Sequence, residues 1–271
     1  MLLGALQGPT EMLPVSSSGH VALLPQLLGW PYAELDDELR KSFEVALHAG
    51  TALALVIALR HEVAEVLRGL SPRRVLFHTL EFLPPAAAAA LWERPIEERC
   101  GGRRGVAVAQ LVGGSALALA DRRPAVRVHE DAGQLDALAI GIGQATALAP
   151  GISRNGATLT AARLRRFERR SANRLSRHAA LPIIVAAAGL KGTRLARRGL
   201  PKHLRAPFAA GAAASFASTL AASRLVPYVD NARTYLPFAA YRVALGLAAL
   251  SSALRPPPSA LPSVPQQWRP R

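Results

Sequence analysis

Uncharged apolar stretches separated by short runs of arginine dominate this chain. They are rich in Ala and Leu, and they lack the alternating polarity and the β-branched residues typical of strands. The sequence therefore predicts an all-helical protein whose small side chains allow close helix packing. The stretches cover 12–33 (counting His20 as neutral), 45–59, 105–120, 137–153 and 206–223, with shorter ones at 179–190 and 243–254.

The length of these stretches bears on whether they cross a membrane. A spanning helix needs roughly 20 apolar residues, and only 12–33 reaches that length unaided. The others would need flanking arginine side chains that reach the interface. Mean hydropathy is only +0.18, so on hydropathy alone a soluble helical protein remains an alternative.

The net charge of +15 comes from 33 Lys and Arg against 18 Asp and Glu. Runs such as Arg73-Arg74, Arg103-Arg104 and Arg122-Arg123 flank apolar segments and are not interleaved with aromatic side chains that could stack on bases. Loops beside a membrane explain this pattern better than a nucleic-acid groove. A basic helical protein that binds nucleic acid or acidic partners is the competing interpretation. The single cysteine, Cys100, excludes an intramolecular disulfide.

A spacing of 137 residues relates two parts of the chain. Both parts read as an apolar helix start, then a proline, then a short Ser/Gly turn. Repeated halves with Pro- and Gly-broken apolar segments are typical of a site lined by discontinuous helices near the middle of a membrane. The matched residues are Gly4, Gln7, Ser16 and Gly19 with Gly141, Gln144, Ser153 and Gly156.

The first part carries Glu11, three serine hydroxyls and His20 within ten residues of an otherwise apolar stretch. Ionisable groups are costly in hydrocarbon, so this grouping favours a shared polar pocket. Pro14 is expected to end the incoming helix. If a new helix begins near His20, free N–H groups between Ser16 and Gly19 would form an anion nest suited to phosphate. The plain alternative is a Ser-rich linker with Glu11 as a helix cap.

The second part, 150–158, places Arg154 among small polar residues and glycines after a long apolar run. A guanidinium presents a rigid fork of donors that matches phosphate oxygens, so Arg154 is the expected clamp for a diphosphate. The arginines that follow are expected to form a solvated or headgroup-facing cluster. These are Arg163, Arg165, Arg166, Arg169 and Arg170.

Several chemical roles remain open for the first part. Ser17 is either a nucleophile activated by His20 or a phosphate ligand, with His20 or water attacking instead. Glu11 is a base, an orienting partner of His20, or a ligand of a divalent cation.

The two parts closely resemble the signatures of the undecaprenyl-diphosphate phosphatases, also called the bacitracin-resistance phosphatases. Residues 7–20 follow the first signature with Met12 in place of Phe, and 150–158 follow the second with Asn155 in place of Ser. Gln7 stands where some members carry a second Glu. The resemblance extends over nearly the whole chain, since Tyr241-Arg242 in the last helix also match.

This resemblance implies catalytic roles for Glu11, Ser17, His20 and Arg154. It also implies a divalent cation, Mg²⁺ or Ca²⁺, for which Glu11 is the candidate ligand. We further expect six polar residues to contact the substrate, namely Gln7, Ser16, Ser18, Ser153, Asn155 and Thr158.

The implied fold is an all-α integral membrane bundle of two inverted repeats, each with a re-entrant helical hairpin that carries one motif. It would form a single membrane domain over 1–254, with halves of about 1–125 and 126–254. The tail at 255–271, rich in Pro, Ser and Arg, is expected to be disordered.

The implied activity releases phosphate from undecaprenyl (polyprenyl) diphosphate and recycles the lipid carrier of cell-wall synthesis. The protein would be multi-pass in the bacterial cytoplasmic (inner) membrane, with its site opening to the outer face. Its partners would be the lipid substrate and the membrane, without nucleic acid. A homodimer is compatible with this interpretation, although the sequence does not fix the oligomeric state. A polyprenyl-phosphate transporter or flippase is the alternative, because inverted repeats with broken helices are also a transporter architecture.

Overall fold

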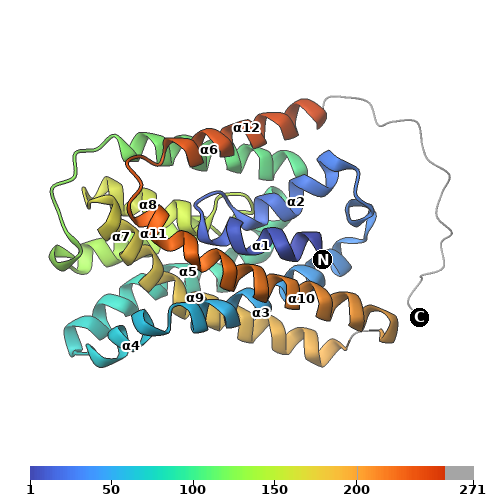
Figure 1. The fold of residues 1–271 in the computed structure, drawn as a ribbon, viewed down its shortest axis with the longest axis horizontal. Helices are drawn as coiled ribbons and strands as arrows, with labels where there is room; N and C mark the ends of the chain where they lie inside the picture. Colours follow the sequence, from blue (N-terminus) through green and yellow to red (C-terminus); the bar gives the residue numbers. More distant parts are fainter. Residues whose placement is uncertain (200, 254–271) are drawn as a thin grey trace.

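A computed structural model describes residues 1–199 and 201–253. This part of the chain consists of helices joined by turns and loops (Figure 1). It contains an isolated bridge between Arg127 and Phe167 and no named strand. The prediction of an all-helical protein is confirmed. The predicted tail, 255–271, lies outside the described residues. The α-helices are α1 Leu2–Met12, α2 Ser17–Leu28, α3 Asp37–Ala58, α4 Arg60–Arg68, α5 Pro72–Cys100, α6 Arg103–Asp121, α7 Gln134–Thr146, α8 Arg154–Leu164, α9 Arg169–Arg198, α10 Lys202–Ala222, α11 Val226–Asp230 and α12 Leu236–Ala253. Short 3-10 turns are η1 Pro31–Glu34, η2 His129–Asp131 and η3 Ser223–Leu225.

Glycines allow the helices to approach one another closely. On α1, a Cβ placed on Gly8 would lie 2.3 Å from the carbonyl carbon of Ser218 on α10. The Ser218 hydroxyl accepts from the Gly8 N–H at 3.1 Å and donates to the Gly4 carbonyl at 2.7 Å. The α1–α10 contact is therefore a backbone-to-backbone approach that a larger side chain at Gly8 would prevent, as expected for small-residue packing.

Two short helical hairpins, α1–α2 and α7–α8, lie at the centre of the bundle (Figure 1). Pro14 lies in the turn that follows α1, as predicted. Ser16 and Ser153 have positive φ angles, 76° and 67°, and each hydroxyl caps the helix that follows. These serines are 137 residues apart, so the sequence spacing corresponds to the same local backbone structure.

Longer helices surround the hairpins. Helix α10 packs on α1 and on α3, and α5 packs on α7. Helices α6 and α12 run side by side along the top of the view in Figure 1. Each hairpin is thus held by long helices that are distant from it in sequence.

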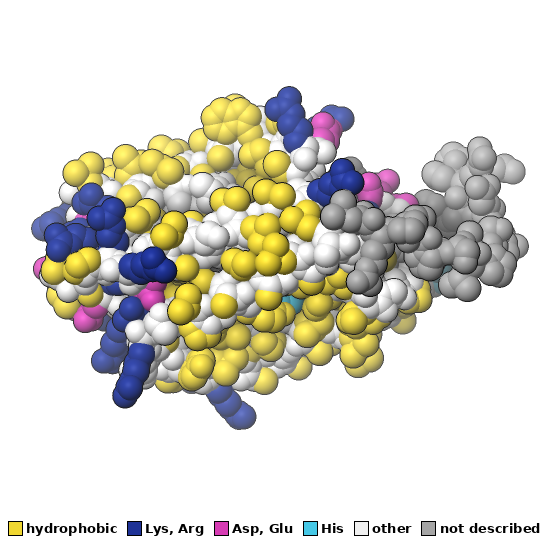
Figure 2. Space-filling model, turned by 90° about the horizontal axis from the view of Figure 1, so that it is seen from above, with side chains coloured by type: hydrophobic (Ala, Val, Ile, Leu, Met, Phe, Trp, Pro, Cys, Tyr) yellow, Lys and Arg dark blue, Asp and Glu magenta, His cyan; other side chains and the backbone are white. Residues whose placement is uncertain are grey.

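Two of these helices, Asp37–Ala58 and Pro72–Cys100, are long and apolar enough to cross a membrane, and Leu236–Ser252 is a shorter apolar helix. Only 28% and 17% of the most apolar windows of the two long helices are buried. A core helix of a soluble protein would bury such a window, whereas a lipid-facing helix would expose it. Figure 2 shows exposed hydrophobic side chains over the middle of one face and a group of basic side chains at its left edge. The helices are therefore compatible with a membrane.

The arginine cluster after the second motif differs from the prediction. Arg166 and Arg170 are exposed, as expected, but Arg163 is only 2% exposed. Its Nη2 atom donates to the carbonyl oxygens of Asp121 at 3.0 Å and Arg123 at 2.5 Å. The prediction for Arg163 is wrong, because its guanidinium fixes the end of α6 instead of meeting solvent or headgroups.

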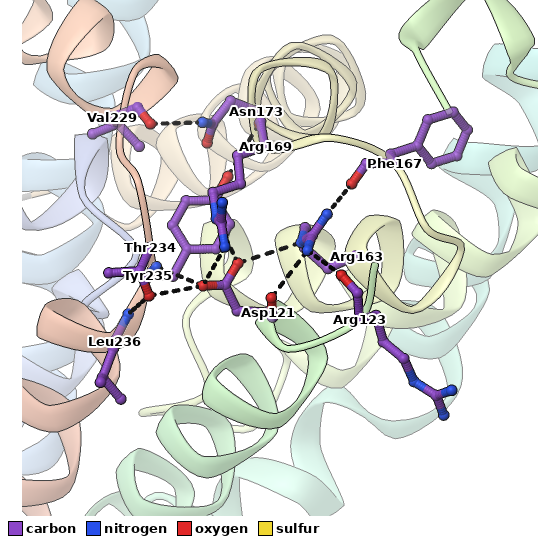
Figure 3. Close-up of polar contacts among 10 residues, drawn as sticks. All are labelled: Asp121, Arg123, Arg163, Phe167, Arg169, Asn173, Val229, Thr234, Tyr235 and Leu236. Atoms are coloured by element: carbon purple, nitrogen blue, oxygen red, sulfur yellow. Dashed lines mark hydrogen bonds and ion pairs between the residues drawn. The ribbon is translucent and has the colours of Figure 1, made fainter. Parts of the chain in front are cut away.

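The Asp121 carboxylate is the centre of this buried network (Figure 3). Its Oδ1 lies 2.8 Å from Arg169 Nε and 3.3 Å from Arg163 Nε. Its Oδ2 accepts from the Thr234 hydroxyl at 3.0 Å and from the Tyr235 N–H at 2.8 Å. One carboxylate therefore joins the ends of α6 and α8 to the starts of α9 and α12.

We expect Asp121→Asn to lower the free energy of unfolding by about 3–5 kcal/mol, because it leaves two arginine charges without their buried counter-charge. The measurement is the unfolding midpoint of the detergent-solubilised chain. Asp37→Asn is the matched control, since Asp37 forms an exposed pair with Arg40 on the first turn of α3 and should change stability by less than about 1 kcal/mol. Equal midpoints for the two variants would contradict a supporting role for the Asp121 network.

Candidate active site

The Glu11 carboxylate, on the last turn of α1, is the point where the two sequence motifs meet. The Ser17 hydroxyl donates to Glu11 Oε2 at 2.7 Å. The Arg154 guanidinium donates through Nη2 to Glu11 Oε1, also at 2.7 Å. The side chains of Glu11 and Arg154 are 11% and 18% exposed, so this charged pair is largely withdrawn from solvent.

Ser17 and Arg154 occupy equivalent places, since each is the first residue of its helix. The first N–H groups of a helix have no intrahelical partner, and the helix dipole favours negative charge there. Two helix N-termini, one hydroxyl and one guanidinium thus surround a single carboxylate. A phosphate brought to this place would meet donors from both hairpins.

The capping bonds reduce the number of free N–H groups in the predicted anion nest. Helix α2 begins at Ser17, three residues before the expected start at His20. The Ser16 hydroxyl accepts from the Gly19 N–H at 3.2 Å, and the Ser153 hydroxyl accepts from the Gly156 N–H at 3.1 Å. One amide in each turn is therefore already bonded within the chain. The Ser16 and Ser153 hydroxyls accept these capping bonds and keep an O–H donor for a phosphate oxygen, so their predicted substrate contacts stay predictions.

Three other predicted substrate-binding residues join the hairpins to one another and to α9. The Ser18 hydroxyl accepts from the Gly151 N–H at 3.2 Å. Asn155 Nδ2 donates to the Met12 carbonyl at 3.0 Å, and Thr158 lies 2.5 Å, oxygen to oxygen, from the Ser176 hydroxyl. These bonds hold the two motifs in contact, whether or not the same residues also touch a substrate.

Gln7 lies one helical turn before Glu11 and is fully buried. Neither atom of its side-chain amide has a hydrogen-bond partner among the described residues, and the same holds for Gln144, 137 residues later. Gln7 is not among the residues that line the cavity beside Glu11. Its predicted contact with the substrate therefore stays a prediction.

A cavity of about 40 Å³ adjoins Glu11 and Arg154. This volume holds a few water molecules, so a diphosphate would require side chains at the rim to move. Arg177 is one rim residue, and it is paired with Glu62 on α4 at 2.9 Å and with Asp230 on α11 at 2.6 Å. Both polar and apolar side chains form the wall. The lining residues are Glu11, Met12, Leu55, Leu59, Arg154, Asn155, Asn173, Ser176, Arg177, Ala180, Leu181, Ile184, Val226 and Val229.

His20 lies on α2, one helical turn after Ser17, and is only 2% exposed. Its Nδ1 is 2.7 Å from the Ser16 carbonyl oxygen, and its Nε2 is 2.8 Å from the Tyr241 hydroxyl on α12. The bonded partner of Ser17 is thus Glu11. The sequence analysis named His20 as the group that would activate a nucleophilic Ser17, whereas this geometry favours Glu11 as the base.

Arg242 and Gln110 support the turns. The sequence analysis gave no role to Gln110 and named Arg242 only as a match to the family. Arg242 is fully buried, and its Nε donates to Gln110 Oε1 at 2.9 Å. Its Nη2 donates to the carbonyls of Gly151 at 3.0 Å and Ile152 at 2.6 Å, while Gln110 Nε2 donates to the Val15 carbonyl at 3.1 Å. Both turns are therefore tied to α6 and α12. The sequence gives no signal for these pairings beyond an Arg inside an apolar helix, because the partners are 90 or more residues apart.

In the described part of the chain, no group of three or more His, Cys, Asp or Glu could hold a metal ion. Glu11 is the carboxylate of the site, and Arg154 and Ser17 already bond to its two oxygens. A cation at this place would therefore need oxygen ligands from a substrate, as Mg²⁺ often takes from phosphates.

Comparison with known proteins gives a consistent picture. The family of the bacitracin resistance protein BacA matches residues 1–248. An undecaprenyl-diphosphatase of Geobacter sulfurreducens is 38% identical over 263 residues, which cover 92% of this chain and 96% of the relative. An undecaprenyl-diphosphatase of Trichlorobacter lovleyi is 37% identical over 265 residues, which cover 92% and 94%. The chain therefore belongs to the family of the bacitracin resistance protein BacA.

Proposed function

We propose that this protein hydrolyses undecaprenyl diphosphate to undecaprenyl phosphate and inorganic phosphate, and so recycles the lipid carrier of cell-wall (peptidoglycan) synthesis. The observation that carries the proposal is the Glu11 carboxylate held between the Ser17 hydroxyl and the Arg154 guanidinium. The names of the relatives support the choice of substrate.

In the proposed first step, Glu11 accepts the proton of Ser17 while the Ser17 oxygen attacks the terminal phosphorus. The bond from that phosphorus to the bridging oxygen breaks, and undecaprenyl phosphate leaves. Glu11 gives its proton to the leaving phosphate oxygen and is ionised again. Water then attacks the phosphoserine with Glu11 as base, the bond between phosphorus and the Ser17 oxygen breaks, inorganic phosphate leaves, and Glu11 returns a proton to the Ser17 oxygen. This division into two steps is ordinary nucleophilic catalysis.

Arg154 has the task of stabilising charge on the transferring phosphoryl group. A guanidinium has five N–H donors, so its bond to Glu11 through Nη2 does not exhaust it. The first N–H groups of α2 and α8 would add donors where charge develops. Catalysis of phosphoryl transfer rests largely on positioning and electrostatic stabilisation of this kind.

The cavity wall fits a substrate that is anionic at one end and apolar at the other. Its polar lining residues are Glu11, Arg154, Asn155, Asn173, Ser176 and Arg177. Apolar side chains from α3, α9 and α11 form most of the remainder. We propose that the diphosphate enters at the polar part and that the polyprenyl chain lies along the apolar part.

For the architecture, we propose two inverted repeats, each with a re-entrant hairpin, in a multi-pass protein of the bacterial inner membrane whose site opens to the outer face. The halves are about 1–125 and 126–254. The matching caps at Ser16 and Ser153 support the repeat, and the exposed apolar windows of α3 and α5 support the membrane.

We further propose that a divalent cation, Mg²⁺ or Ca²⁺, enters with the diphosphate, with Glu11 as its protein ligand. Such an ion, when bound, would neutralise charge on the phosphates. A homodimer is a separate proposal, which the mass of the detergent-solubilised protein tests.

Transport of a polyprenyl phosphate is the second candidate function, and the relatives, which carry an enzyme name, do not favour it. The purified full chain should release inorganic phosphate from undecaprenyl diphosphate in detergent. Translocation without phosphate release would decide for the transporter.

We expect Arg154→Lys to lower kcat by about 10²-fold or more, because an ammonium keeps the charge but loses the fork of donors. The matched control is Arg170→Lys, which makes the same exchange at an exposed position on α9 and should retain wild-type turnover. Phosphate release under saturating substrate is the measurement. If Arg154→Lys keeps the wild-type turnover, a bidentate contact between Arg154 and the phosphate is not needed for catalysis.

We expect Ser17→Ala and Glu11→Gln each to lower kcat by about 10³-fold, and the double variant to be no slower than the worse single variant. Groups that act as a unit are strongly non-additive, since losing either one already removes the step. A full double-mutant cycle of phosphate release measures this coupling. If the two effects multiply, Glu11 does not act through Ser17.

A further inference from the structure

The Tyr241 side chain contacts His20 in two ways. Its hydroxyl oxygen is 2.8 Å from His20 Nε2. The two rings are also stacked, with centroids 5.5 Å apart and an interplanar angle of 12°. The contact joins α2 to α12 across 221 residues of sequence.

The direction of this hydrogen bond follows from the other side of the ring. His20 Nδ1 is 2.7 Å from the Ser16 carbonyl oxygen, which can only accept, so the Nδ1 atom carries a proton. His20 is only 2% exposed, and burying a charged imidazolium at such a place would be costly. The neutral ring therefore has its lone pair on Nε2, and the Tyr241 hydroxyl donates to it.

The neighbouring residues hold Tyr241 in place. The next residue, Arg242, is fixed by bonds to Gln110 and to the Gly151 and Ile152 carbonyls. Helix α12 also approaches α6 closely, because a Cβ on Gly114 would lie 3.0 Å from the Ala239 carbonyl oxygen. Tyr241 itself is 46% exposed, whereas His20 is 2% exposed. The contact thus joins a buried imidazole to a partly exposed tyrosine.

We infer that Tyr241 is a positioning residue for His20 in the reaction, an inference that rests on the proposed function. The hydroxyl and the stacked ring fix the orientation of the imidazole, and the bond from Nδ1 to the Ser16 carbonyl fixes its tautomer. Ser16 completes the arrangement from the other side, so the turn that caps α2 also sets the state of His20. A hydrogen bond to one ring nitrogen of a histidine commonly fixes the state of the other nitrogen in this way.

The first test is the turnover of Tyr241→Phe, which keeps the ring and removes the hydroxyl. We expect kcat to fall about tenfold, the cost of one ordinary hydrogen bond, while KM changes less than about twofold. Tyr228→Phe is the matched control, because Tyr228 is 65% exposed on α11 and packs against Phe238. It should retain the wild-type kcat. A wild-type kcat for Tyr241→Phe would overturn the inference.

The second test reads His20 directly through the ¹⁵N resonances of its ring in the detergent-solubilised full chain, assigned with His20→Gln. The wild-type protein should show the Nδ1–H tautomer with a hydrogen-bonded Nε2. The Nε2 resonance should move in Tyr241→Phe and stay in Tyr228→Phe. An unchanged resonance in Tyr241→Phe would overturn the inference. If the wild-type chain releases no phosphate, the proposed function fails, and this spectrum still decides whether Tyr241 positions His20.

Discussion

The contact of one carboxylate with both hairpins is the interaction on which the rest of the site depends. Glu11 accepts from Ser17 at the start of α2 and from Arg154 at the start of α8. A charge in apolar surroundings needs a counter-charge and hydrogen bonds, or its burial is costly. Glu11 and Arg154 meet this need for each other. The same carboxylate bonds to the Ser17 hydroxyl and to the Arg154 guanidinium, the two groups that the proposed mechanism assigns to attack and to phosphate binding.

The surrounding polar groups are bonded to the backbone of the two turns. Ser16 and Ser153 cap the helices, and Ser18 receives the Gly151 N–H of the other hairpin. Arg242 holds the carbonyls of the second turn from α12. In a bundle rich in Ala and Leu, irregular backbone is tolerated where such partners exist. Bonds within the protein therefore hold the backbone of both turns in place without a substrate. Electrostatic stabilisation of a transition state requires such preorganised donors.

The sequence predicted the helical class and the type of site because those signals are local. Glu11, Ser17 and His20 lie within ten residues, and the 137-residue spacing relates Ser17 to Arg154. Tyr241 and Gln110 were not predicted as partners, because contacts across 221 and 95 residues leave no local pattern. Arg163 was wrongly expected to meet solvent, because its partners are backbone carbonyls and Asp121, about 40 residues away in sequence. Hydrogen bonds between side chains and distant backbone groups were therefore the part of the structure that the sequence pattern could not predict.

The central claim is that Glu11 activates Ser17 for attack on the terminal phosphate. Its most direct test is to stop the enzyme during turnover and locate the phosphoryl group on the protein by mass spectrometry. Quenching in acid preserves phosphoserine, and quenching in alkali preserves phosphohistidine. The account predicts a phosphoryl group on Ser17 in the acid quench. A phosphoryl group on His20 in the alkaline quench, with Ser17 unmodified, would contradict it.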